Sequence, residues 1–227
     1  MTAFWIALQF LTTFPVQLKA MPTPQQNGQS LLFYPVVGLM IGVILFAIAS
    51  VLHAVPIVLL SSVILVIWIW LAGGLHLDGL ADTADAWVGG FGDAERTLKI
   101  MKDPACGPIG VLSLIIICIL KWSAIYLLLQ KQMYIALLLF PVLGRLVPLV
   151  LFLTTNYVRA KGLGSSIAGT MPRKSAWLLV MVIVCGSFYF SWLGLIACMS
   201  MLIGLWYLRR KFIQRIGGIT GDTVGAS

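Results

Sequence analysis

The sequence predicts an all-α fold: a polytopic integral membrane helix bundle with about six transmembrane helices and short interfacial helices. Of its 227 residues, 60% are apolar and 10% are charged, against roughly 45–50% and 25% in soluble domains. An ordinary water-soluble domain and a disordered chain are both excluded, because neither keeps so much hydrocarbon in water. The apolar residues fall into six runs bounded by polar, Gly or Pro residues. These runs are residues 31–52, 56–72, 108–129, 133–154, 176–191 and 193–208.

The first and last apolar segments need separate interpretation. Residues 3–14 are also apolar, but Pro15 and the polar stretch 19–30 end them early, so we expect a short interfacial or re-entrant helix there. One helix over residues 176–208 would be about 50 Å long, which exceeds the roughly 30 Å hydrocarbon core. We therefore predict two spans with a tight turn near residue 192. The chain is treated as a single membrane-embedded domain, residues 1–227.

Alternating spans place the loops on two sides of the membrane. The long loops share one side: residues 15–30, 73–107, 155–175 and 209–227. That side receives all seven acids and most of the Lys and Arg residues behind the net charge of +8, so we expect it to face the cytoplasm. The basic residues flank the spans and form no stripe interleaved with aromatic side chains, which argues against nucleic-acid binding.

The most informative segment lies between the second and third long runs. Asp78, Asp82 and Asp85 have the spacing i, i+4, i+7, which places them on one helical arc of about 60°. Three neighbouring carboxylates repel one another unless a cation neutralises them. Oxygen ligands favour Mg²⁺, Mn²⁺ or Ca²⁺ over zinc or copper. A solvated helix face is the alternative, but the residues between the aspartates are mostly apolar.

Candidate substrate contacts surround this acidic segment. His76 precedes it and is open to three roles: general base, phosphate contact or core histidine. A second helix is expected from Asp93 to Asp103, with Arg96, Lys99 and Asp103 on one face and Lys102 beside them. The loop 103–110 offers backbone N–H groups to an oxyanion. Basic groups beside a metal-loaded acidic cluster are typical of phosphoryl transfer.

Two basic residues fall inside apolar runs. Arg145 is in the middle of its run, and Lys121 is near the end of another, from which it can snorkel. A cation there costs about 2.5–3.5 kcal/mol on insertion scales, so it usually faces a wet cavity or a partner. Two glycine-rich segments, 162–166 and 217–223, lie in the long loops. The second is the stronger candidate, because Thr220 and Asp222 lie between glycines that allow close approach of a substrate.

At these residues the sequence resembles the cobalamin synthase family, the adenosylcobinamide-GDP ribazoletransferases, over essentially the whole chain. The most specific piece is the string GGLHLDGLADTAD at residues 73–85. The other matching pieces are residues 9–16, 34–39, 100–103, 162–164 and 218–225, with Gly107 and Gly110. Members of this family continue into a last, glutamate-containing hydrophobic helix, and this chain ends at Ser227, so we expect that helix to be missing.

The resemblance implies a multi-pass enzyme of the cell inner (cytoplasmic) membrane that needs Mg²⁺. Its substrates are adenosylcobinamide-GDP and α-ribazole or α-ribazole 5′-phosphate, and GMP is released. We expect Asp78, Asp82 and Asp85 to hold Mg²⁺, with Asp78, Asp82 or His76 taking the hydroxyl proton. The predicted substrate-binding residues are Arg96, Lys102, Asp103, Arg145, Thr220 and Asp222. The sequence leaves open a homo-oligomer and contacts with other cobalamin-pathway enzymes.

Two other functions share features with this sequence. A CDP-alcohol phosphotransferase shares an Asp-Gly-x-x-Ala start, but Asp82 stands where that motif carries Arg and the later aspartates come too early. An ion carrier would have acids within the spans, whereas every acid here lies in a loop or at a membrane edge. Both rivals are therefore less favoured than the transferase.

Overall fold

The structure is a computed structural model that describes residues 2–18, 20–160 and 162–227. Throughout these ranges the regular elements are helices, which confirms the predicted all-α class. The helices are α1 (Thr2–Leu11), α2 (Pro24–Ser30), η1 (Leu31–Phe33), α3 (Tyr34–Val51), α4 (Ile57–Leu71), α5 (Leu75–Gly89), α6 (Ala94–Ile100), α7 (Pro108–Gln130), α8 (Ala136–Thr154), α9 (Leu163–Thr170), α10 (Arg173–Ser187), η2 (Phe188–Phe190), α11 (Ser191–Ile216) and α12 (Gly221–Gly225).

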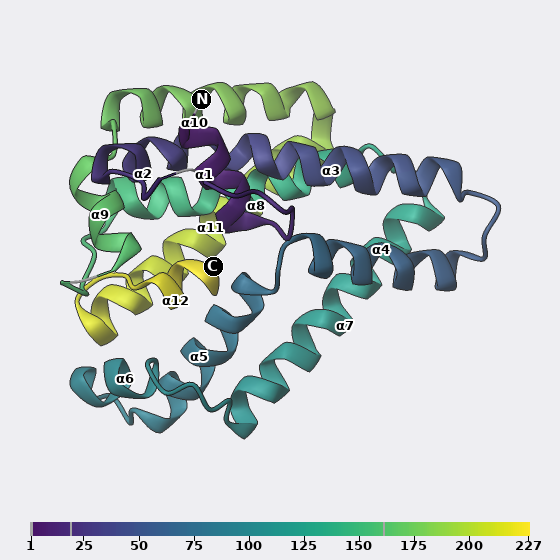
Figure 1. The fold of residues 1–227 in the computed structure, drawn as a ribbon. Coiled ribbons are helices and arrows are strands. Elements are labelled where there is room, and N and C mark those ends of the chain that lie inside the picture. The colour runs from purple at the N-terminus through teal and green to yellow at the C-terminus, as the bar shows by residue number, and fades with distance from the viewer. Residues whose placement is uncertain (1, 19, 161) are drawn as a thin grey trace.

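Within the described ranges, four helical segments are long and apolar enough to cross a membrane, or up to five with the bent pair α4–α5. One of the four, Arg173–Ile216, contains both α10 and α11. The chain reverses between these two helices (Figure 1), at Ser191, which has a φ of 54°. The turn predicted near residue 192 is thus present. The six predicted runs correspond to α3, α4, α7, α8, α10 and α11.

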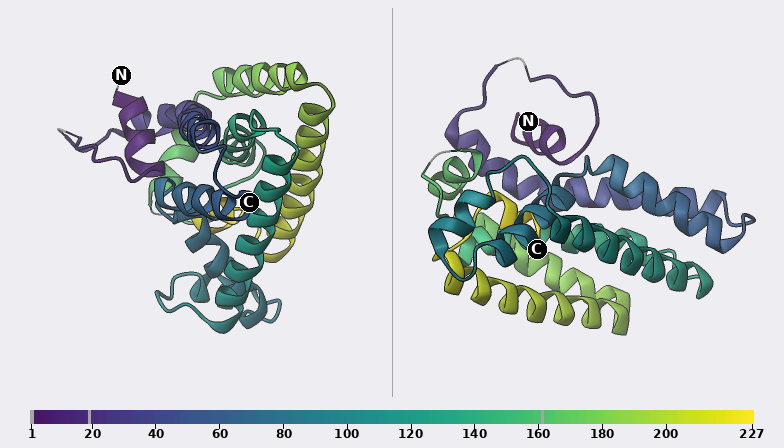
Figure 2. Two further views of the ribbon diagram at one scale, coloured as in Figure 1. Left: turned by 90° about the vertical axis from the view of Figure 1, so that its right-hand side faces the viewer. Right: turned by 90° about the horizontal axis from the view of Figure 1, so that it is seen from below.

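The two ends of the bundle carry different elements. The α3–α4 and α7–α8 connections lie at the right-hand end in Figure 1, whereas α6, α9 and α12 gather toward the opposite side. α5 leaves α4 at an angle of 86°, and we treat it as a helix outside the spans. Both views in Figure 2 show the C-terminus near the middle of the molecule, where α12 contacts α5 and α8.

The centre of the bundle is the contact between α3 and α8. A Cβ atom at Gly38 would lie 2.5 Å from the Pro141 carbonyl oxygen, and one at Gly42 would lie 2.8 Å from that of Leu137. Small residues let membrane helices approach this closely, since lipid itself is as apolar as a leucine side chain. α8 is the most buried helix, and Arg145 on it is only 7% exposed.

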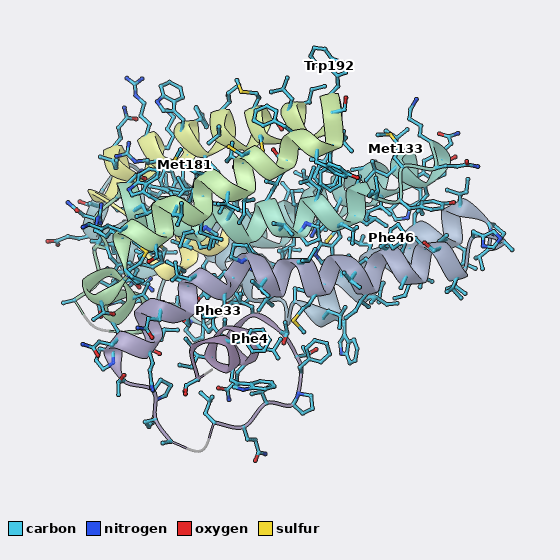
Figure 3. The ribbon with its side chains drawn as sticks, turned by 90° about the horizontal axis from the view of Figure 1, so that it is seen from above. Phe4, Phe33, Phe46, Met133, Met181 and Trp192 are labelled. Carbon is cyan, nitrogen blue, oxygen red and sulfur yellow. The ribbon has the colours of Figure 1, made fainter. Side chains whose placement is uncertain are left out.

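Three helices present apolar side chains to the outside. Ile119 on α7, Met181 on α10 and Ile203 on α11 are each about 60% exposed (59%, 63% and 61%). Figure 3 shows Trp192 pointing away from the bundle at the α10–α11 turn. Exposed apolar faces on long helices are expected for side chains that contact lipid.

The N-terminal segment forms the short helix that we expected. α1 is apolar and packs against α2, η1 and α3, and the ring centroids of Phe4 and Phe33 are 6.0 Å apart. Figure 3 shows these two rings beside each other. The polar stretch that follows was predicted as a loop, and this was wrong in part. Thr23 and Gln26 form a capping box that starts α2, which satisfies two backbone N–H groups at the helix start.

The last long helix also extends beyond its predicted end. α11 continues to Ile216, so Arg209 and Arg215 lie on a helix and reach neighbouring elements. Arg209 Nη2 donates to the Thr154 carbonyl at 2.7 Å, and Arg215 Nη2 donates to the Trp87 carbonyl at 3.0 Å. The first bond satisfies a carbonyl at the C-terminus of α8, where a cation is also favoured by the helix dipole. The prediction that residues 209–227 form a loop is therefore wrong as far as Ile216.

Candidate active site

The acidic helix α5 is positioned by its two ends. Gly74 precedes it with a φ of 70°, a left-handed conformation that glycine adopts without a steric penalty. Asp78 lies in the first turn, where the positive end of the helix dipole stabilises a carboxylate. Further along, Gly79 allows α12 to pack directly on α5, since a Cβ atom there would lie 2.7 Å from the Asp222 carbonyl oxygen. This contact brings the loop after α11 to the acidic helix.

The acidic side chains of α5 and α12 influence one another electrostatically. The pKa of Asp82 is raised to about 6, first by partial burial and then by the charges of Asp78, Asp222 and Asp85. The pKa of Asp222 is also raised, because burial and the charge of Asp78 outweigh the opposing effect of Arg159. Ionised carboxylates at this site therefore repel one another, and a bound cation would relieve that repulsion.

Asp85, however, is directed toward the start of α7. Its Oδ2 accepts a hydrogen bond from Gly107 N at 2.7 Å, and its Oδ1 accepts one from Gly110 N at 2.8 Å. We expected the 103–110 loop to offer these N–H groups to a substrate oxyanion, and this was wrong for Gly107 and Gly110, because a carboxylate of the protein binds them. Asp85 thereby ties α5 to the N-terminus of α7.

Arg159 was missed by the sequence analysis. Its Nη2 donates to Asp222 Oδ2, and this ion pair is partly exposed, at 21% and 20% for the two side chains. The pairing depends on an isolated parallel bridge between Tyr157 and Ile219 that brings the two loops together. The sequence carried a weak signal: Arg159 lies in a long loop near the glycines of 162–166.

We define the acidic cavity as the space of about 270 Å³ between α5, α9 and α12. Its polar lining comes from Asp78, Asp222, Arg159, Tyr34, Tyr157 and His76. Gly162, Gly164 and Gly221 complete the same wall, so backbone can approach a ligand there. The predicted residues Asp78, Asp222 and His76 are thus brought together. Asp82 lies one turn further along α5 and does not line this cavity.

We define the basic cavity as a second space of about 310 Å³ on the other side of the α5–α12 contact. Arg145, Lys121 and His76 line it, together with Trp68 and the C-terminal residue Ser227. His76 borders both cavities, and its Nε2 is buried without a hydrogen-bond partner in the described structure. Arg145 on α8 and Lys121 on α7 therefore line the same cavity.

Four predicted substrate-binding residues lie elsewhere. Arg96 lies over the Phe91 ring, 5.0 Å from its centroid, and Thr220 is fully buried as the N-cap of α12. The helix expected from Asp93 to Asp103 ends at Ile100. Asp103 therefore lies beyond that helix and accepts a hydrogen bond from Ala105 N, while Lys102 is exposed. None of these four side chains lines either cavity.

The described residues contain no group of three or more His, Cys, Asp or Glu side chains placed to hold a metal ion. The three-aspartate site at Asp78, Asp82 and Asp85 therefore remains a prediction. Mg²⁺ commonly binds through one or two carboxylates, with waters and substrate phosphates completing its octahedron. Asp78 and Asp82, with Asp222 facing them, fit this mode of binding better than a cage made of protein ligands alone.

Comparison with known proteins gives a family match. A family model described as Cobalamin-5-phosphate synthase matches residues 3–227. A relative from Acinetobacter baumannii is 59% identical over all of this chain and 92% of its own length. Relatives from Pseudomonas fluorescens and Stutzerimonas stutzeri are 50% and 49% identical, over 100% and 97% of this chain and 93% and 90% of their own lengths. All three are named adenosylcobinamide-GDP ribazoletransferase. No solved structure matches this chain.

Proposed function

The chain belongs to the cobalamin-5-phosphate synthase family, and from this premise we propose how its two cavities serve the reaction. The reaction of this enzyme joins adenosylcobinamide-GDP to ribazole. The observation that supports our site assignment is the acidic cavity, where Asp78 and Asp222 lie with Arg159 beside a glycine-lined wall. A CDP-alcohol phosphotransferase is not favoured by the family match.

The acidic cavity suits the diphosphate of adenosylcobinamide-GDP. Asp78 and Asp82, with Asp222 opposite, would hold Mg²⁺, which neutralises phosphate oxygens and withdraws charge from the phosphorus. Without a cation, the carboxylates would repel a diphosphate, and Arg159 alone does not balance them. Arg159 supplies a planar guanidinium that can meet a phosphate oxygen, and its ion pair with Asp222 fixes its direction.

In the proposed reaction, a ribose hydroxyl oxygen of ribazole attacks the phosphorus on the cobinamide side. The new P–O bond forms as the P–O bond to GMP breaks, and Arg159 faces the charge that develops on the leaving phosphate. The hydroxyl proton passes to Asp78, the α5 carboxylate that lines the cavity. A loose phosphoryl-transfer transition state depends mainly on positioning and charge stabilisation, which the two cavities provide.

Removal of metal gives the direct test of the magnesium assignment. We expect purified enzyme treated with EDTA to lose GMP release from adenosylcobinamide-GDP and α-ribazole, and excess Mg²⁺ to restore it. Product analysis should identify the joined corrinoid. Full activity in EDTA, after metal analysis shows no residual divalent cation, would contradict a metal role but would leave the transferase function intact.

We further propose that the enzyme resides in the cell inner membrane and that the acidic cavity faces the cytoplasm. The support is the one-sided distribution of acids and basic loops, because short basic loops remain in the cytoplasm. Cys106 is exposed in the loop before α7 and provides a natural label. We expect a membrane-impermeant maleimide to modify Cys106 in inverted vesicles and not in intact spheroplasts. The opposite labelling pattern would reverse the orientation.

A further inference from the structure

The basic cavity holds two cations that form no ion pair among the described residues, and the C-terminal residue Ser227 also lines it. Arg145 comes from α8 and Lys121 from α7, and both line the cavity. In the described part of the chain, the one ion pair joins Arg159 to Asp222, on the other side of the α5–α12 contact. Lys121 Nζ lies 4.1 Å above the centroid of the Trp68 ring, which stabilises a cation and leaves its N–H groups available.

The position of Arg145 is fixed by the packing of the bundle. At Gly38 on α3, a Cβ atom would lie 3.0 Å from Arg145 Cγ, so the glycine makes room for the stem of this side chain. Arg145 is 7% exposed, and a buried guanidinium is costly unless it contacts an anion. The Arg145 guanidinium is buried and held in place by helix packing, which indicates an anion-binding site.

The charges of the two cavities differ in a way that distinguishes two kinds of phosphate. The acidic cavity has two carboxylates against one guanidinium, so it suits a phosphate group that arrives with a divalent cation. The basic cavity has two cations and a histidine against the terminal carboxylate of Ser227, so its side chains are cationic and suit a phosphate without metal. A phosphate monoester carries a charge of about −1.5 to −2 at neutral pH, which Arg145 and Lys121 balance.

We infer that the basic cavity binds the 5′-phosphate of the acceptor, α-ribazole 5′-phosphate. The inference rests on the proposed function, in which the diphosphate occupies the acidic cavity. His76 borders both spaces, so the ribose between the acceptor phosphate and its attacking hydroxyl would pass beside this side chain. Arg145 and Lys121 thus determine the preference for the phosphorylated acceptor and take no part in bond making.

The test compares two acceptors with one set of variants. With α-ribazole 5′-phosphate, we expect Arg145→Gln and Lys121→Gln each to raise KM about 10- to 100-fold, the range for losing a charge-assisted phosphate contact. With α-ribazole, KM should stay within about threefold of wild type, and kcat should change little with either acceptor. Arg145→Lys should recover part of the lost affinity. Lys131→Gln is the matched control for Lys121→Gln, since Lys131 is the C-cap of α7, the helix that carries Lys121, and lines neither cavity.

Several outcomes are distinguishable. Equal losses with both acceptors, or no loss with either, would overturn the inference. The enzyme is also assayed in vesicles of different lipid composition. A KM that changes with the lipid and not with the acceptor would overturn the inference too, since a lipid phosphate would then be the ligand. If Arg145→Gln does not fold, Lys121→Gln and competition by inorganic phosphate on the wild type remain. Phosphate should compete with the phosphorylated acceptor, and non-competitive behaviour would contradict the inference. Wild-type enzyme that transfers to neither acceptor would instead refute the proposed function.

Discussion

Replacing Asp78 by Asn is expected to lower kcat at least about 1,000-fold, which corresponds to about 4 kcal/mol of transition-state stabilisation. The exchange preserves side-chain shape and removes the negative charge. Asp78 is the α5 carboxylate that lines the acidic cavity, so no neighbouring residue on that helix can replace it there. GMP release measures the loss, and thermal unfolding in detergent shows whether the fold is intact.

The matched control for this variant is Glu95→Gln, which also removes one carboxylate charge. Glu95 lies in the first turn of α6 and lines neither cavity, so we expect near wild-type turnover. Asp82→Asn should reduce activity less than Asp78→Asn, because Asp82 acts from one turn further along the helix. An Asp78→Asn enzyme with near-full activity would remove the central carboxylate from the mechanism.

Replacing Asp85 by Ala is expected to destabilise the fold by about 2–6 kcal/mol, because two backbone N–H groups lose their acceptor and each unsatisfied group costs about 1–3 kcal/mol. The donors are Gly107 N and Gly110 N, at 2.7 and 2.8 Å. Activity should fall as α7 separates from α5. The measurement is the unfolding midpoint in detergent, compared with Glu95→Gln.

This variant also separates two roles for Asp85. If Asp85 links helices, Asp85→Asn should lose less stability than Asp85→Ala, since the amide keeps one acceptor oxygen. If Asp85 is instead a metal ligand, as its spacing in the sequence predicted, the Ala variant would unfold at the wild-type midpoint and would still be inactive. That combination of results would support Asp85 as a metal ligand.

Much of the fold could be predicted because hydropathy reports directly on the membrane. The apolar runs correspond to α3, α4, α7, α8, α10 and α11, and the turn near residue 192 is present. The errors lie in polar segments, where the signal is local. The capping box at Thr23 and Gln26 was visible in the sequence and was missed. The basic end of α11 was predicted as part of the loop 209–227, although it is helical and Arg209 caps α8.

In the candidate site, the sequence predicted which residues share a helix face but not the partners of their side chains. Spacing indicated that Asp78, Asp82 and Asp85 share one arc of a helix, but it could not show which partner each side chain meets. Asp85 meets the backbone of α7 because the loop 101–107 folds back, a contact across 22 residues of chain for Gly107. Arg159 reaches Asp222 across 63 residues, and nothing in the local pattern of either residue predicts that pairing.

The sequence by itself determined the helical class, the apolar spans, the acidic helix and the family, because each depends on composition or on residues close together in the chain. Only the tertiary structure decided that the α5–α12 contact divides the site into an acidic and a basic cavity, and that Arg145 and Lys121 face the same one. The physical reason is that charge complementarity is a property of distances in space. Two cations on α7 and α8 become one anion site only when those helices pack around a common cavity.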